Sequence, residues 1–136
     1  WAWVVDQMAK SRNSLIGSTR PDGRPHAAPV WGVWYEGTLY FSTDTQSRKA
    51  RNLADRPDVV VHLESGDDSV ILEGVVEVIT DMTLLRQVGK AYALKYPPYD
   101  PVGEGTPGLW YALRPHTALA WMEHDFPNTA TRWDFT

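Results

Sequence analysis

The sequence predicts a mainly β fold, a closed or partly closed antiparallel β-barrel with peripheral helices. Six or seven short segments rich in β-branched and aromatic residues are predicted to form strands. Tight turns join most of them, which favours antiparallel pairing. Closing such a sheet into a barrel removes its exposed edges. Of the 136 residues 43% are apolar, enough for one packed core, and no repeat or linker divides them. We therefore expect a single domain over 1–136.

The first third of the chain is predicted to form one helix and three strands. Apolar residues of the N-terminal segment recur at helical spacing. Pro21, Gly23 and Pro25 mark a turn, because proline presets one backbone dihedral angle and glycine accepts a positive one. We expect, in order, a helix over 1–11, a strand over 15–19, a turn over 20–25, one strand over 26–35, a two-residue turn at 36–37 and a strand over 38–43.

The rest of the chain is predicted to contain two more helices between strands. Ser47 and Asp81 are good N-caps, and Pro57 follows the end of the first helix. Prolines and glycines cluster over 96–108, which predicts an ordered loop or lid. We expect, in order, a helix over 47–55, a strand over 59–65, a turn over 66–68, a strand over 69–79, a helix over 81–95, strands over 109–114 and 117–121 joined at Pro115 and His116, and an irregular tail over 123–136.

Charge, cysteine content and hydropathy exclude several classes of protein. The formal net charge of −4 opposes nucleic-acid binding, and the absence of cysteine excludes disulfides and cysteine-based zinc sites. Apolar runs are far shorter than a membrane span and no signal peptide is visible, so we expect a cytoplasmic protein without a membrane partner. No metal site is predicted, because no ligand spacing occurs among the four histidines, His26, His62, His116 and His124.

No group of residues predicts a dedicated catalytic centre. Glu64, Asp67 and Asp68 form an acidic cluster, but a turn accounts for these residue types better than acid–base chemistry does. The chain also lacks the glycine-rich loops of nucleotide-binding folds and the nucleophile elbow of hydrolases. We therefore assign no catalytic residue.

The clearest functional feature is a predicted strand–turn–helix unit over 40–53. Ser42 and Thr43 end the strand, Ser47 caps the helix, and Arg48 and Lys49 occupy its first turn. Cations at a helix N-terminus oppose the helix dipole, whereas free N–H groups and fixed positive charge favour an anion there. The pattern predicts a phosphate site, with a charged surface helix as the alternative interpretation.

These residues belong to a longer pattern that resembles the pyridoxamine-phosphate-oxidase-like split β-barrel family, in particular its flavin/deazaflavin oxidoreductase branch. The resemblance extends over almost the whole chain, and the order and spacing of its segments are fairly specific. The matching segments are 21–31, 39–43, 47–53, 60–68, 73–74 and 130–135. The resemblance implies an oxidoreductase that binds coenzyme F420, which we favour, or FMN, in a groove at a homodimer interface.

The resemblance also implies which residues contact the cofactor. Arg48 and Lys49 would bind its phosphate, with help from Ser42 and Thr43. Ser69 occupies the position of a ring-contacting glutamine in the oxidases. Arg132 and Trp133 would reach the cofactor from the second subunit. The strand beside the ring system would contribute backbone hydrogen bonds and apolar contacts through Ala27, Ala28, Pro29, Val30, Trp31 and Gly32.

Two departures from the family's patterns change the expected activity. True pyridoxamine phosphate oxidases carry a lysine where this chain has Gly32, and their C-terminal Arg-x-His motif is absent here. Oxidation of pyridoxamine phosphate is therefore not expected. The tail has Trp133-Asp134-Phe135 where the deazaflavin branch usually has Trp-Arg-Phe, which weakens the case for a tail contact with a phosphate or glutamate chain.

The leading hypothesis is hydride transfer to or from a small planar or unsaturated molecule, stacked against Trp31 or Trp34 under the 96–108 lid. One alternative is a non-catalytic protein that binds flavin or haem, with a histidine as the axial haem ligand. Another is an unliganded dimer with a structural role. The Arg48–Lys49 pair counts against an unliganded protein.

Overall fold

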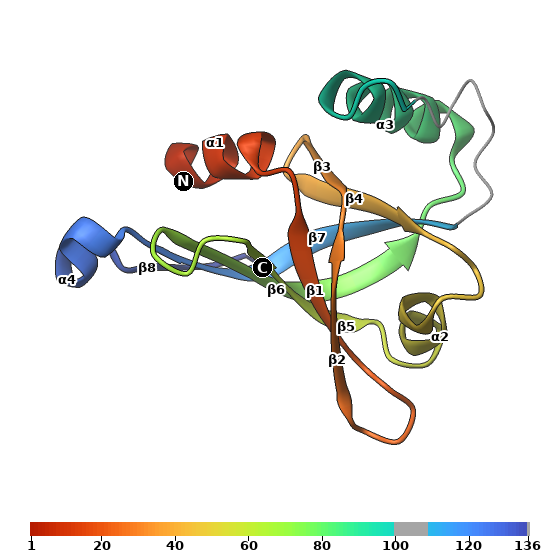
Figure 1. Cartoon of the computed structure of the whole chain (residues 1–136), viewed down its shortest axis with the longest axis horizontal. Helices are drawn as coiled ribbons and strands as arrows, with labels where there is room; N and C mark the ends of the chain where they lie inside the picture. The colour runs from red at the N-terminus through yellow and green to blue at the C-terminus, as the bar shows by residue number, and fades with distance from the viewer. Residues whose placement is uncertain (100–108, 136) are drawn as a thin grey trace.

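The computed structural model describes residues 1–99 and 109–135 and shows a curved antiparallel sheet with helices at its margins (Figure 1). The strand order is β2-β1-β5-β6-β7-β4-β3, and β8 pairs with β7. The predicted fold class, a mainly β split barrel with peripheral helices, is confirmed. The elements are α1 (Ala2–Lys10), β1 (Ser14–Thr19), β2 (Pro25–Val30), β3 (Gly32–Tyr35), β4 (Thr38–Thr43), α2 (Arg48–Asp55), β5 (Asp58–Leu63), β6 (Ser69–Val78), α3 (Met82–Lys95), β7 (Leu109–Trp121), the 3-10 helix η1 (Glu123–Asp125), α4 (Phe126–Thr129) and β8 (Thr131–Asp134).

Local side-chain chemistry explains several of the element boundaries. The Ser47 hydroxyl accepts a hydrogen bond from the N–H of Ala50 at 3.1 Å and starts α2, and the Asp81 carboxylate caps α3 in the same way. Glu36 and Gly37 have φ angles of 48° and 78°, as a two-residue hairpin turn between β3 and β4 requires. The predicted caps and this turn are confirmed.

The single strand predicted over 26–35 is wrong, because the chain bends at Trp31. The resulting strands β2 and β3 lie at the two ends of the strand order, so one residue links the two edges of the sheet. Gly32 is buried at the bend, where an added Cβ would lie 2.8 Å from Cδ1 of Leu39. The absence of a side chain therefore lets β3 approach β4 closely while β2 departs in another direction (Figure 1).

The main core lies between the concave face of the sheet and α1. Val4 and Met8 of α1 pack onto inward-facing strand residues that include Phe41, Leu72 and Leu113. A second, smaller cluster lies under α3, where Val88 contacts Tyr40 and Trp110 with other aromatic and aliphatic side chains around them. These two clusters fix α1 and α3 on the sheet, because burial of apolar surface is the main stabilising term in folding.

The C-terminal part differs from the prediction in two ways. The strands predicted over 109–114 and 117–121 are one strand, β7, which continues through Pro115. Gly74 pairs with Pro115 and Glu73 with Thr117, so His116 is the extra residue of a β-bulge. The bulge tolerates a proline that donates no ladder hydrogen bond. The tail predicted to be irregular forms η1, α4 and β8.

The bulge predicts a position-specific effect of adding one methyl group. A Cβ at Gly74 would lie 2.9 Å from the carbonyl oxygen of Arg114 and 3.3 Å from Cα of Pro115, atoms of the backbone that cannot rotate away. We expect Gly74→Ala to lower the free energy of unfolding by about 1–3 kcal/mol in urea titrations. Gly66→Ala is the control, since no atom of the described residues lies within 4 Å of a Cβ built on Gly66. Equal unfolding midpoints for the two variants would contradict the bulge geometry.

Candidate functional site

The predicted strand–turn–helix unit closes as a compact network of hydroxyl groups. The Oγ1 atom of Thr43 and the Oγ atom of Ser47 are 2.9 Å apart, and the N–H of Ser47 donates to the carbonyl of Asp44 at 3.0 Å. The Ser42 hydroxyl donates to the carbonyl of Leu109 at 3.0 Å, across to β7. Thr43 and Ser47 thus lie together at the start of α2, while Ser42 is bonded to the neighbouring strand.

Arg48 and Lys49 carry charges that this part of the molecule does not neutralise. Arg48 is exposed and Lys49 is half-buried. Across residues 1–99 and 109–135, neither forms an ion pair with a carboxylate; the ion pairs found there join Lys10 to Asp6, Arg24 to Asp22, Arg56 to Asp55 and Arg132 to Asp134. Two unneutralised cations at the positive end of a helix dipole raise the local potential, and an anion would lower it.

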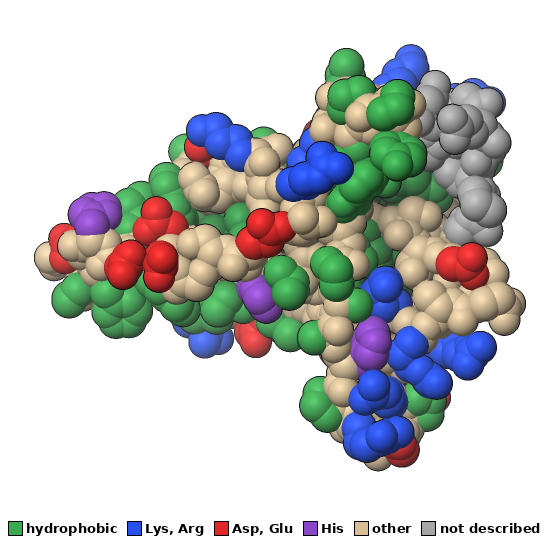
Figure 2. All heavy atoms as spheres, in the orientation of Figure 1, with side chains coloured by type: hydrophobic (Ala, Val, Ile, Leu, Met, Phe, Trp, Pro, Cys, Tyr) green, Lys and Arg blue, Asp and Glu red, His purple; other side chains and the backbone are tan. Residues whose placement is uncertain are grey.

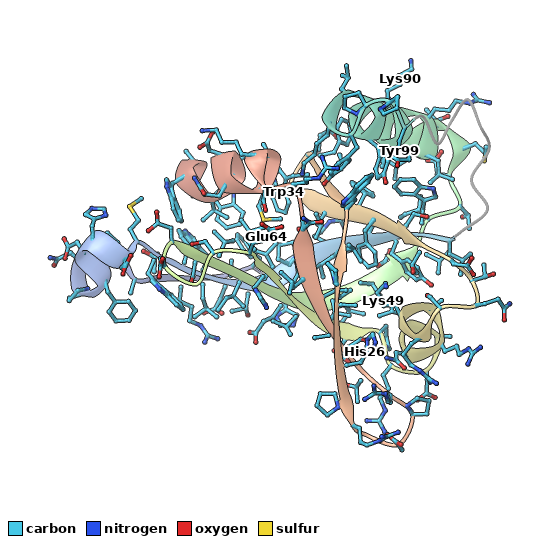
Figure 3. The ribbon with its side chains drawn as sticks, in the orientation of Figure 1. His26, Trp34, Lys49, Glu64, Lys90 and Tyr99 are labelled. Atoms are coloured by element: carbon cyan, nitrogen blue, oxygen red, sulfur yellow. The ribbon has the colours of Figure 1, made fainter. Side chains whose placement is uncertain are left out.

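The fold adds two residues to this positive region that the sequence interpretation did not assign. Burial lowers the pKa of His26, and the nearby charges of Arg20, Lys49 and Arg48 lower it further. Figure 2 shows Lys and Arg side chains around a histidine at the β2 end of the molecule, and Figure 3 shows His26 and Lys49 between β2 and α2. The Arg20 guanidinium also donates to the carbonyl of Pro25 at 2.7 Å, which holds it at the β1–β2 turn. We call Arg20, His26, Arg48 and Lys49 the basic cluster.

A buried amide explains why α2 lies next to His26. The side-chain N–H of Asn52 donates to the Ser18 hydroxyl at 3.1 Å, and both residues are buried. Ser18 of β1 is the direct strand partner of His26 in β2. This contact joins α2 to β1 across 34 residues of sequence, so no local pattern around residue 26 indicates it. The composition of α2 alone would not reveal the basic cluster.

An open groove of about 620 Å³ runs along β1, β2 and β5 beside the basic cluster. Its lining includes His26 and Ala27, the carboxylates of Asp58 and Glu73, and the apolar side chain of Val60. The groove is large enough for a flat ring system, since typical small-molecule sites have volumes of about 300–1,000 Å³.

The predicted cofactor strand β2 lies at the free edge of the sheet. Pro25, Ala27 and Pro29 are exposed and alternate with His26, Ala28 and Val30, which are half-buried or buried. Prolines in an edge strand place the missing N–H on the side away from the partner strand. The outer edge of β2 therefore presents backbone carbonyls and the N–H of Ala27.

At the far end of β2, the backbone of Gly32 is already bonded within the chain. Its N–H donates to the Tyr96 hydroxyl at 3.2 Å, and its carbonyl accepts from Nζ of Lys95 at 2.7 Å and from the Tyr96 hydroxyl at 3.0 Å. The Trp31 ring stacks on Tyr96 with centroids 4.7 Å apart, and the Arg12 guanidinium lies 4.7 Å from the Trp31 ring centroid. Gly32 therefore has no free backbone N–H for a cofactor, and Trp31 is held by Tyr96, which follows α3, and by Arg12 of the α1–β1 connection.

Three predicted site residues lie away from the basic cluster. Ser69 begins β6 opposite Trp121, and Arg132 and Trp133 belong to β8. The start of β6 and the strand β8 lie on the opposite side of the molecule from α2 (Figure 1). The Arg132 guanidinium lies 3.1 Å from the Asp134 carboxylate, and Trp133 packs edge-on against Trp1 at 5.2 Å. The chain by itself does not bring these three residues together with Arg48 and Lys49.

The described residues also bear on the excluded metal-binding and membrane-spanning classes of protein. No group of three or more histidine, cysteine or acidic side chains in residues 1–99 and 109–135 could hold a metal ion. No helix in those ranges is long and apolar enough to cross a membrane. The predicted lid falls mainly on 100–108, which lie outside the described residues; the part described, 96–99, forms a turn in which the N–H of Tyr99 donates to the carbonyl of Tyr96.

The lysine beside Gly32 predicts an unusual dependence of stability on pH. Burial lowers the pKa of Lys95 from 10.5 to about 8 in the folded protein. Between these values the unfolded chain binds more protons than the folded one, so the wild-type free energy of unfolding should rise with pH relative to that of Lys95→Met. Burial raises the pKa of Tyr96 from 10.0 to about 12, so this residue makes the free energy of unfolding fall with pH, but only above pH 10.

Urea unfolding at pH 7.5 and 9.5 measures this difference, and the exposed Lys90→Met variant on the same helix is the control. We expect the wild type to gain stability over Lys95→Met at the higher pH, with Lys90→Met parallel to the wild type. Identical pH dependence in all three proteins would mean that the Lys95 ammonium is not desolvated.

Comparisons with known proteins agree with this architecture. No curated protein matches the chain. Among solved structures, a conserved hypothetical protein from Mycobacterium tuberculosis is 27% identical, with a TM-score of 0.79 over 90% of this chain and 84% of its own. An F420 reductase shares the fold at 21% identity, with a TM-score of 0.65 over 83% of this chain and 93% of its own. A haem-binding protein from Mycobacterium smegmatis also shares it at 16% identity, with a TM-score of 0.78 over 96% of this chain and 56% of its own. The family model described as pyridoxamine 5'-phosphate oxidase matches residues 4–113, so the chain belongs to the pyridoxamine 5'-phosphate oxidase family of split β-barrels.

Proposed function

We propose that this protein is an oxidoreductase that holds coenzyme F420, or FMN, in a groove between two copies of the chain. It would transfer a hydride to or from a small organic substrate. The observation that carries the proposal is the pair of cations at the start of α2, which no described carboxylate neutralises and which flanks an accessible edge strand.

The surroundings of the basic cluster favour a bound phosphate group over water. Arg48 and Lys49 begin α2, where free backbone N–H groups and the helix dipole add to their charge. Nδ1 of His26 is buried and has no hydrogen-bond partner among the described residues. An orphaned nitrogen and unneutralised cations are features that a bound oxyanion would satisfy.

The ring system of the cofactor would lie along β2, away from the phosphate. Carbonyls of the strand edge and the N–H of Ala27 match a ring edge that carries both donors and acceptors, and Pro29 and Val30 add apolar contact. When bound, the cofactor would supply the hydride chemistry, while the chain supplies orientation and a dry surface. Trp31, fixed against Tyr96, would define the end of the ring site, and the substrate would stack near it.

A second copy of the chain would complete the site. Ser69, Arg132 and Trp133 are too far around the sheet to meet the basic cluster of their own chain, so a second copy would have to supply them. Of the three, Ser69 is buried and its hydroxyl already donates to the carbonyl of Gly66 at 3.0 Å. Val60 and Val75 expose 36% and 45% of their surface on the sheet, and a second copy would cover such apolar residues. The ion pair with Asp134 keeps Arg132 partly neutralised, so Trp133 is the stronger candidate for this contact.

Haem binding without catalysis is the second candidate, because two structures with this fold are haem proteins: the one from Mycobacterium smegmatis and a haem storage protein from Vibrio cholerae. His62 on β5 is exposed and would be the candidate axial ligand, although its Nδ1 lies 2.8 Å from the carbonyl of Leu63. A Soret band in the purified protein would favour haem, flavin bands would favour FMN, and a colourless protein would favour an exchangeable deazaflavin.

Removing the two cations tests the cofactor site. We expect Arg48→Ala/Lys49→Ala to weaken FMN or F420 binding by at least tenfold for each charged hydrogen bond lost, measured by fluorescence titration, with unchanged thermal unfolding. Arg86→Ala/Lys90→Ala on α3 removes the same charge elsewhere and should bind normally. Wild-type affinity of the Arg48/Lys49 variant would reject the assignment.

Mass measurement tests the shared groove. We expect light scattering to give twice the chain mass at micromolar concentration, because residues from two copies would form each site. Val75→Glu would place a charge on the exposed apolar face and should reduce both the dimer fraction and cofactor affinity. A monomeric wild-type protein that binds cofactor at full affinity would show that one chain is sufficient.

A further inference from the structure

We propose that His26 is a ligand of the phosphate in the basic cluster and becomes protonated when a phosphate monoester binds. This inference rests on the proposed cofactor site and adds to it a fourth group and a proton. The sequence interpretation gave His26 no role in phosphate binding, and the expected phosphate contacts all came from the 42–49 segment.

The position of His26 supports the assignment. It pairs with Ser18 in the β1–β2 ladder, and Ser18 is the residue that holds α2 through Asn52. The imidazole therefore faces the start of α2, beside Lys49 (Figure 3). It also lines the groove in which the ring system is proposed to lie. A group bound by Arg48 and Lys49 would be next to this imidazole.

The charges around His26 explain its state before the ligand binds. Arg20 faces it from the β1–β2 turn, and Arg48 and Lys49 face it from α2; burial and these three cations all lower its pKa below 6.5. The groove also contains Asp58, Glu73 and His116, none of which contributes to that shift. These effects favour the neutral ring, and its Nδ1 has no hydrogen-bond partner among the described residues.

An arriving phosphate reverses this electrostatic balance. Its negative charge offsets the three cations and favours the charged imidazolium, which offers two N–H donors in place of one. The pKa of His26 should thus be higher in the complex than in the free protein. Between the two values, binding takes up a proton, and affinity rises as pH falls. At pH values above the pKa of His26 in the complex, the neutral imidazole offers the phosphate a single N–H donor.

Isothermal titration calorimetry tests the proposal with FMN as the phosphate monoester and riboflavin as the ligand without phosphate. Titrations at pH 6 and pH 8, in buffers of different ionisation enthalpy, give the number of protons taken up. FMN itself ionises near pH 6, but this term cancels when the wild type is compared with His26→Gln. We expect the wild type to take up more protons than His26→Gln at pH 6. FMN affinity of the variant should be roughly tenfold weaker at pH 6 and less affected at pH 8.

His116→Gln is the matched control, because His116 lines the same groove but is not among the groups that shift the pKa of His26. It should keep the wild-type proton count. Nitrogen-15 NMR of the wild-type imidazoles with and without FMN reports His26 protonation directly and does not depend on the variant folding. Equal proton uptake in wild type and His26→Gln, with FMN still bound far better than riboflavin, would overturn the role of His26 and leave the phosphate site standing. Equal binding of FMN and riboflavin by the wild type would reject both.

Discussion

The close packing of the chain at Gly32 is the constraint on which the rest of the structure depends. A side chain on Gly32 would displace the Leu39 side chain, whose Cδ1 would lie 2.8 Å from the added Cβ, and the backbone N–H and carbonyl of Gly32 are bonded to Tyr96 and Lys95. The bend at this point sends β2 to one end of the strand order and β3 to the other. The sheet then curves around α1 and the core beneath it, and the outer edge of β2 has no strand partner among the described residues.

The basic cluster follows from a second long-range contact rather than from the bend alone. The buried amide of Asn52 fixes α2 on Ser18, and this places the first turn of α2 beside β2. Charges from two distant parts of the chain, Arg20 on one side and Arg48 with Lys49 on the other, therefore surround one imidazole. Positive charges held close together repel one another, and a bound anion would reduce this repulsion. The charge distribution that the fold creates therefore supports the proposed function.

The sequence was a good guide where the structure depends on neighbouring residues. The caps at Ser47 and Asp81 and the turn at Glu36 and Gly37 are set by side chains and dihedral angles within a few positions, so their patterns predicted them. The break at Trp31 was not predicted, although Pro29 and Gly32 within 26–35 are poor strand formers, because neither residue alone says where the chain turns. Its cause lies in Leu39, Lys95 and Tyr96.

The candidate site shows the same division between local and long-range causes. The hydroxyl and cation pattern over 42–49 is local and identified the start of α2, whereas His26 and Arg20 join it only through the sheet register and the Asn52 contact. The continuity of β7 was missed for a related reason. Pro115 suggests a strand end by itself, but its partner Gly74 and the bulge at His116 accommodate it.

The two prolines of β2 have a consequence for how the molecule avoids unwanted association. A free strand edge is a template on which another polypeptide can add itself, and such growth leads to aggregates. Pro25 and Pro29 deny an incoming strand two of the amide donors it would need, so extension of the sheet is disfavoured. A flat heterocycle needs fewer of those donors. The same edge can therefore stay open to a small molecule while remaining closed to fibre formation.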